Sequence, residues 1–196
     1  MDNASVRMRL DSLAEIPAAV LPPWFSLRPY RTGDRETWVQ LYSAAEPFLT
    51  ITPEIFDREF RGEESALRQR MLFLIAPNGQ CVGTSTAWYD DLDHDPRCGR
   101  VHWVAIHPAF QGRGLAKPLL TRTLQTLREL GHDHAYLLTS TGRIPAITLY
   151  LRYGFLPDIR SDAEAQAWTA CAAALRPALQ GLVAGPGHGA PPSDSN

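Results

Sequence analysis

The chain has 196 residues, of which 44% are hydrophobic and 20% are charged. This length suits one domain with a sizeable core rather than two. The formal net charge of −2 at pH 7 lacks the basic excess that phosphate-backbone binding requires, so we do not expect a nucleic acid partner.

Cysteine usage and the N-terminal residues indicate the compartment. The three cysteines, Cys81, Cys98 and Cys171, form no CxxC pair, and the first ten residues lack the apolar block of a signal peptide. No apolar run approaches membrane-spanning length. We therefore expect a reduced, cytoplasmic protein that does not associate with a membrane.

The first predicted elements follow a proline-bearing lead-in segment at residues 1–23. An alternating strand pattern begins at Trp24, so we place the start of the domain there. Asp34 is suited to cap one helix, and Pro53 favours the first turn of a second. The Asn78-Gly79 pair is typical of a hairpin turn, so the apolar runs on either side are predicted to be antiparallel strands.

A strand, a helix and a second strand follow at residues 100–107, 114–130 and 134–139. The first is rich in Val, Ile and Trp, and the helix carries leucines at helical spacing. A helix of this length between two strands is a crossover connection, so the two strands should lie parallel. Another helix is expected at residues 144–153.

The C-terminal part is predicted to be an alanine-rich helix that starts at Asp162 and ends near Leu175. After it, Gly, Pro, Ser and Ala leave little apolar surface to bury, so residues 177–196 are expected to be a disordered tail. The domain itself is then residues 24–176.

The turn at residues 111–116 lies between a buried strand and a helix start, which is a suitable place to bind an anion. Glycines allow close approach, and the free N–H groups of the first helical turn favour a phosphate oxygen, with Arg113 and Lys117 nearby. The alternative is a tight turn that only packs the helix on the strand. Lys117 stands where a dinucleotide motif needs a third glycine, and the Gly-Lys-Ser/Thr of a P-loop is absent, so both nucleotide motifs are excluded.

Two segments carry a resemblance to a known family. The Gln111 turn, of the form Gln/Arg-x-x-Gly-x-Gly/Ala, and the segment at residues 146–150 followed by Gly154-Phe155 resemble signatures of the GNAT superfamily of acetyltransferases. The resemblance covers residues 24–159. It implies an α/β (mixed α+β) fold with a twisted, mostly antiparallel mixed sheet, whose central parallel strands splay apart between flanking helices.

The resemblance also implies acetyl-CoA as the donor substrate, no metal, and an amine as the acceptor. By position, the backbone of Val104 and Ile106 pairs with the pantetheine arm as an added strand would, and the Val104 amide polarises the thioester carbonyl. The implied cofactor-binding residues are Val104, Ala105, Ile106, Gln111, Gly112, Arg113, Gly114, Leu115, Ala116 and Lys117.

Two residues are candidates for acid–base catalysis. Tyr150 aligns with a tyrosine that members of the family use to protonate the leaving thiolate; its alternative role is as a packed aromatic. In the family that the sequence resembles, a glutamate base is common near the position of Arg100, and arginine cannot act as a base. His102 is our candidate base, on the strand face that Val104 should share, although a buried histidine is as often structural.

Predicted acceptor-binding residues lie on three segments that should rim the acceptor side: Phe48, Asp91, Thr139 and Thr141. The carboxylates of residues 90–95 would favour a cationic amine. Pro96 occupies the position where an EF-hand loop needs glycine, so no calcium site is expected there.

The leading hypothesis is an N-acetyltransferase that moves the acetyl group directly to a primary amine in a ternary complex, as a monomer or a homodimer. The alternative is a catalytically silent CoA-binding sensor or structural protein of the same fold. The acceptor is not predicted, because this fold takes many acceptors through changes in a few loops.

Overall fold

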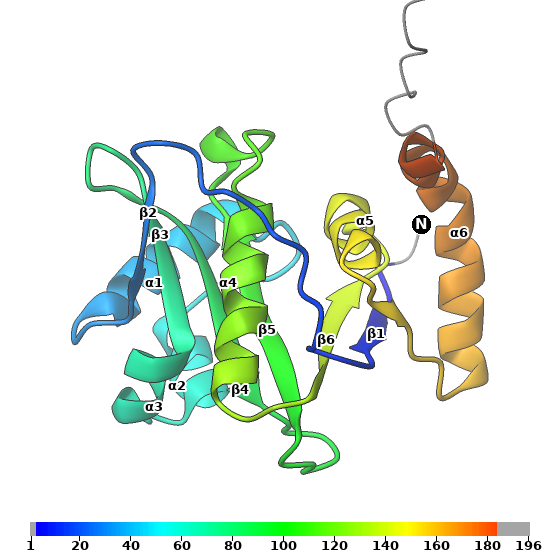
Figure 1. Cartoon of the computed structure of the whole chain (residues 1–196), viewed down its shortest axis with the longest axis horizontal. Coiled ribbons are helices and arrows are strands. Elements are labelled where there is room, and N and C mark those ends of the chain that lie inside the picture. Colours follow the sequence, from blue (N-terminus) through cyan, green and yellow to red (C-terminus); the bar gives the residue numbers. More distant parts are fainter. Residues whose placement is uncertain (1–2, 184–196) are drawn as a thin grey trace, which may run out of the picture.

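The computed structural model describes residues 3–183, which form a seven-stranded sheet with helices on both faces (Figure 1). The strands are β1 (Ser5–Leu10), β2 (Ser26–Pro29), β3 (Met71–Ile75), β4 (Cys81–Tyr89), β5 (Cys98–Ile106), β6 (His134–Ser140) and β7 (Leu156–Pro157). The helices are α1 (Asp34–Ala45), α2 (Pro53–Phe60), α3 (Glu64–Arg70), α4 (Ala116–Glu129), α5 (Ile144–Arg152) and α6 (Asp162–Val183). The strand order is β2-β3-β4-β5-β6-β1-β7.

The β5–β6 pair is parallel and the other neighbouring pairs in the described chain are antiparallel, which confirms both the hairpin and the crossover. β5 and β6 are in register only where residues 98–100 meet residues 134–136. Beyond these pairs the two strands separate, and Figure 1 shows β6 turning away from β5 toward α5. The splayed, mixed sheet expected from the resemblance is thus confirmed.

Strand alternation places helices on both faces of the sheet. In β3, Leu72 and Leu74 belong to the cluster that includes Leu119 of α4, whereas Phe73 belongs to the cluster that includes Trp38 of α1. Because successive strand side chains point to opposite faces, α4 and α1 cover opposite sides of the sheet.

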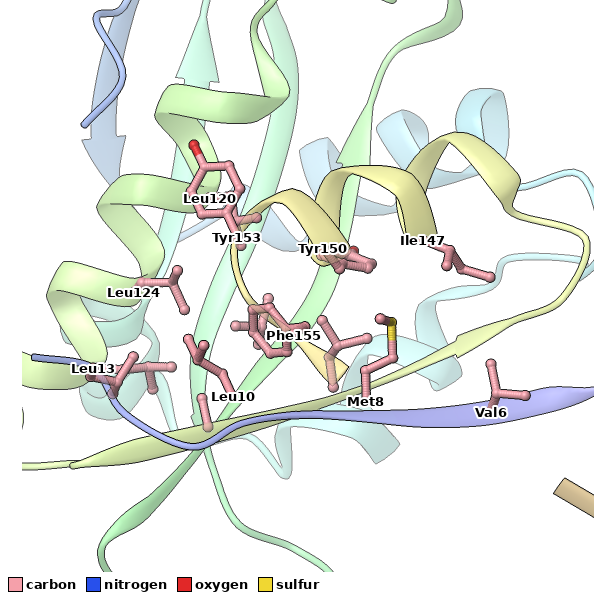
Figure 2. Packing of buried hydrophobic residues seen from close by; sticks show 14 of the residues in the cluster. Val6, Met8, Leu10, Leu13, Leu120, Leu124, Ile147, Tyr150, Tyr153 and Phe155 are labelled. Carbon is pink, nitrogen blue, oxygen red and sulfur yellow. The ribbon is translucent and has the colours of Figure 1, made fainter. Parts of the chain in front are cut away.

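A separate part of the core forms between β1, α4 and α5. Figure 2 shows Val6, Met8 and Leu10 of β1 packed beneath α5, where they meet Tyr150 and Phe155. All five side chains are at most 8% exposed. This packing fixes α5, and therefore Tyr150, against the β6 side of the splay.

Strand β1 corrects the expected domain start near Trp24. Residues 5–10 lie within the lead-in segment predicted at 1–23, yet they pair with both β6 and β7 inside the sheet. The sequence carries the signal, because buried Val6, Met8 and Leu10 alternate with Arg7 and Arg9.

Two helix boundaries also differ from expectation. Asp34 is the first residue of α1 and Gly33 is its cap, while the Asp34 carboxylate accepts the Arg31 N–H. α6 continues past Leu175 to Val183, so residues 177–183 are helical rather than part of a tail, and residues 184–196 lie outside the described residues. No helix in residues 3–183 is both long enough and apolar enough to cross a membrane.

Candidate active site

A cavity of about 390 Å³ lies where β5 and β6 separate. Its walls come from residues 3–5, the ends of α1 and α2, the middle of β5, the end of β6 and one side of α5. The cavity therefore draws on both halves of the splayed sheet, and it contains His102, Val104 and Tyr150.

The glycine turn follows the end of β5, the strand that also supplies Val104 to the cavity. Gly112 and Gly114 have φ values of 74° and 77°, a backbone region that favours glycine. A Cβ at either glycine would meet nothing within 4 Å, so the glycines face open space, while Leu115 at the end of the turn packs with Ile106 of β5 and Leu119 of α4. The Gln111 side chain donates to the Ile106 carbonyl over 3.0 Å and ties the turn to the strand.

Helix α4 begins at Ala116, directly after this turn. Its first N–H groups have no helical partner and carry the positive end of the helix dipole. The guanidinium of Arg113 lies 4.8 Å from the centre of the Phe110 ring. The turn thus offers open backbone donors beside a cation, which fits a pyrophosphate.

A bulge interrupts β5 between His102 and Ala105. The register with β4 shifts there, and Trp103 has a φ of 50°, which is uncommon for a bulky residue. As a result, Val104 packs on the cluster that includes α4 and α5, whereas His102 contacts Phe60 of α2 at 5.5 Å between rings. The prediction that His102 and Val104 share a strand face is therefore wrong, because the extra residue breaks the alternation.

His102 is paired with Glu59 of α2. Its Nε2 lies 3.4 Å from Oε2 of Glu59, and the same oxygen accepts the Trp103 indole N–H over 3.1 Å. Burial lowers the pKa of His102 to about 4, and interaction with His102 lowers the pKa of Glu59 to about 2. At neutral pH the imidazole is neutral and the carboxylate is ionised, so Nε2 can donate its proton toward Glu59 and Nδ1 is left without one.

Tyr150 stands on the opposite wall of the cavity. Its side chain is 7% exposed, and its ring packs on Phe155 at 5.8 Å between centres. Burial raises the pKa of Tyr150 to about 12. The phenol therefore keeps its proton at neutral pH, as a proton donor must.

Two of the four predicted acceptor residues line the cavity, and two do not. Phe48 and Thr139 do, and the Arg143 guanidinium lies 5.1 Å from the centre of the Phe48 ring. Asp91 is instead paired with Arg100 over 2.9 Å, and Thr141 Oγ1 accepts the Ala4 N–H over 3.1 Å.

The acidic loop at residues 90–95 also lies apart from the cavity lining. The Asp90 carboxylate accepts three backbone N–H groups of its own loop, and Asp93 pairs with Arg7 and Arg160. Because these charges are already compensated, the expected attraction of this loop for a cationic acceptor is not supported.

Sequence reasoning missed Glu59 and Tyr42 as site residues, and it placed Glu46 only in a loop that should rim the acceptor side. Glu59 and Tyr42 line the cavity, and Glu46 joins Arg143 across it, with 2.6 Å between Oε2 and Nη2. The Glu46–Arg143 pair is separated by 97 positions in the chain, so no local motif announces it. Within residues 3–183, no group of three or more His, Cys, Asp or Glu side chains is placed to hold a metal ion.

A mixed sheet that opens between two parallel strands, with a glycine turn at the end of one of them and a buried tyrosine in the gap, fits the architecture of an acyl-CoA-dependent acyltransferase. The chain belongs to the acetyltransferase (GNAT) family, whose family model matches residues 35–155. The resemblance inferred from the two sequence signatures is thereby confirmed.

Curated relatives extend this match. A mycothiol acetyltransferase of Pseudarthrobacter chlorophenolicus is 31% identical over 159 residues, covering 76% of this chain and 48% of the relative. That of Nocardia farcinica is 40% identical over 161 residues, covering 73% of this chain and 49% of the relative. The chain thus spans about half the length of the curated relatives it matches.

Solved structures share the fold. A GCN5-related N-acetyltransferase from Sphaerobacter thermophilus superposes with a TM-score of 0.67 at 21% identity, over 80% of this chain and 49% of that one. The ribosomal-protein-S18-alanine N-acetyltransferase from Escherichia coli gives 0.56 at 19% identity, over 69% and 79%. At these identities the likeness shows the fold alone.

Proposed function

We propose that this chain is an N-acetyltransferase that moves the acetyl group of acetyl-CoA directly to a primary amine in a ternary complex. The observation that carries the proposal is the single cavity in the splay, because Val104, His102 and Tyr150 all line it. The word acetyltransferase in the names of the curated relatives supports acetyl over a longer acyl group.

The donor is expected to bind along β5 and its following turn. The open positions at Gly112 and Gly114 and the first N–H groups of α4 suit the pyrophosphate. The bulge at Trp103 disrupts the ladder locally, which supports the proposal that the Val104 N–H is free to donate to the thioester carbonyl.

The acid and base stand on different walls of the same cavity. The amine nitrogen forms a bond to the acetyl carbon, and the carbon–sulfur bond breaks. In this proposal His102 takes the amine proton and Glu59 stabilises the imidazolium that results. Tyr150 gives its phenolic proton to the departing sulfur. Proton exchange with solvent then removes the proton from His102 and returns one to Tyr150, which restores the enzyme.

The remaining features of the proposal concern the protein's surroundings. We infer a reducing, cytoplasmic setting, which is supported by the unpaired thiols of Cys81, Cys98 and Cys171. We also propose that the protein acts as a monomer or a homodimer, and that it binds neither nucleic acid nor a membrane.

The test is an assay of free thiol released from acetyl-CoA in the presence of a panel of primary amines, with product masses to confirm N-acetylation. Initial rates measured at varied concentrations of both substrates should give intersecting reciprocal plots, since transfer is direct. Parallel plots would point to an acetylated enzyme instead. If acetyl-CoA binds but no amine in the panel is acetylated, the silent CoA-binding protein is the better description.

A further inference from the structure

Several polar atoms in the cavity wall are buried and unpaired. Tyr42 Oη, Arg100 Nε and Thr139 Oγ1 have no hydrogen-bond partner within the described residues, and His102 Nε2 has only its 3.4 Å contact with Glu59. Nine side-chain atoms of that part of the chain share this state, and these four belong to cavity-lining residues. A buried donor or acceptor that makes no hydrogen bond costs about 1–3 kcal/mol, so the cluster favours a ligand that supplies hydrogen-bond partners.

Tyr42 is held firmly in position. Its ring lies 4.3 Å from that of Trp38 and 5.0 Å from that of Trp103, which stands at the β5 bulge. Burial is the largest cause that raises the pKa of Tyr42 well above its usual value, and Tyr150 and Glu46 raise it further. The Tyr42 hydroxyl is therefore a neutral, fixed hydrogen-bonding group close to the phenol that we propose as the acid.

Thr139 approaches the cavity from the other wall. It lies on β6, opposite Val6 of β1, and is 6% exposed. Its hydroxyl and that of Tyr42 thus come from elements on the two sides of the splay. An acceptor between them would meet one neutral polar group on each side.

The cationic side chains of the cavity already have anionic partners. Arg100 pairs with Asp91 over 2.9 Å, and Arg143 pairs with Glu46 over 2.6 Å. The carboxylate of Glu46 also accepts the Phe48 N–H over 2.9 Å. The lining therefore offers neutral hydroxyl groups, and its cationic charges are already balanced by Asp91 and Glu46. An acceptor carboxylate could reach the free Nε of Arg100 only by adding a negative charge to a cavity that already holds the ionised Glu59.

Resting on the proposed N-acetyl transfer, we propose that the acceptor is a small primary amine flanked by neutral hydrogen-bonding groups such as hydroxyls or amides, and that Tyr42 and Thr139 select it. The polar groups of such an amine hydrogen-bond to the two hydroxyls in place of solvent water. An apolar amine leaves both hydroxyls unpaired, and a site built to bind a hydroxyl rejects analogues that lack it.

Three amines of nearly equal size test this selection. 2-Amino-1,3-propanediol carries two hydroxymethyl groups, 3-aminopentane replaces both with ethyl groups, and serine replaces one with a carboxylate. We expect kcat/KM for the diol to exceed that for 3-aminopentane by about tenfold or more, as lost hydrogen bonds to a polar site predict. Serine should also be the poorer acceptor.

Tyr42→Phe and Thr139→Val remove one hydroxyl each while keeping the shape of the side chain. The preference is the ratio of kcat/KM for the diol to kcat/KM for 3-aminopentane. Each variant should lower this ratio about three- to tenfold, the worth of one hydrogen bond. Because the preference is a ratio within one enzyme, differences in amine basicity cancel when variants are compared. Tyr89→Phe, the same change outside the cavity lining, is the matched control and should leave the preference unchanged.

The outcomes separate this inference from the proposed function. Acetylation of amines without preference for the diol, or a preference that both variants leave intact, overturns the inference alone. Acetylation of no amine by protein that binds acetyl-CoA overturns the proposed function, and the inference with it.

Discussion

The glycine turn and the proposed acceptor wall of the cavity are built in different ways. The turn is one continuous stretch, residues 111–116, whose offered groups are backbone N–H donors and whose glycines face open space. The acceptor wall is assembled from side chains of α1, α2, β5, β6 and α5, including Tyr42, Glu59 and Thr139. Changes in the turn should therefore alter donor affinity, and changes in the wall should alter turnover and acceptor choice.

The largest effect is expected from Tyr150→Phe, which removes the proposed acid and keeps the ring that packs on Phe155. The value of kcat should fall about 10²- to 10³-fold, the usual worth of a positioned proton donor. Affinity for acetyl-CoA, measured by calorimetry, should change less than about twofold because the phenol is outside the turn. Tyr89→Phe serves as the control, and an unchanged kcat in Tyr150→Phe contradicts the role of Tyr150.

Gly114→Asp tests the turn from the donor side. A carboxylate at the phosphate position should weaken acetyl-CoA binding about 100-fold by charge repulsion and lost access. Gly79→Asp is a matched control, since Gly79 has a φ of 82° against 77° for Gly114, and a Cβ at either meets nothing within 4 Å. Equal losses in both variants would mean that backbone strain, rather than phosphate binding, explains the result.

The buried pair in the acceptor wall should show in the pH dependence of stability. His102 has a folded pKa of about 4 against an ordinary value of 6.5. Between these values the unfolded chain holds the proton and the folded protein does not, so this stability is present above pH 6.5 and is lost as pH falls toward 4. The free energy of unfolding, measured in urea, should fall between pH 7.5 and pH 4.5 in both proteins. The fall should be about 2 kcal/mol smaller in His102→Asn than in wild type.

An exposed histidine provides the reference for that measurement. His94→Asn makes the same substitution in the surface loop between β4 and β5, and it should keep the wild-type loss of stability. If His102→Asn loses as much stability as wild type, His102 is not held neutral by burial.

The smallest effect is expected from the ion pair that joins the two halves of the acceptor wall. Arg143→Met frees Glu46, whose side chain is only 7% exposed, and removes the cation over Phe48. Acceptor KM should rise about five- to tenfold, with acetyl-CoA affinity unchanged. Arg35→Met, which breaks the Arg35–Asp57 pair between α1 and α2 away from the cavity lining, should leave both constants alone.

The donor side could be predicted from the sequence because its information is local. The spacing of Gly112 and Gly114 after a buried strand, together with the leucines of α4, indicated the turn and the crossover, and the structure has both. The splay itself followed from the resemblance to the family. Strand β1 could also have been found, since Val6, Met8 and Leu10 alternate with arginines.

The acceptor wall could not be predicted in the same way. Glu59 meets His102 across 43 positions, and that meeting depends on how α2 packs against β5. The bulge at Trp103 reverses the face on which His102 lies, and a regular two-residue period cannot reveal an inserted residue. Asp91 was predicted to bind the acceptor because the sequence does not reveal that its carboxylate pairs with Arg100.

Calorimetric titration of the wild-type protein with acetyl-CoA, desulfo-CoA and ATP tests the central claim most directly. The account predicts that both CoA compounds bind with similar affinity, because the turn recognises the pyrophosphate and the splay takes the pantetheine arm, and that ATP binds far more weakly. If the folded protein binds neither CoA compound, or binds ATP as tightly, the cavity between β5 and β6 is not an acyl-CoA site.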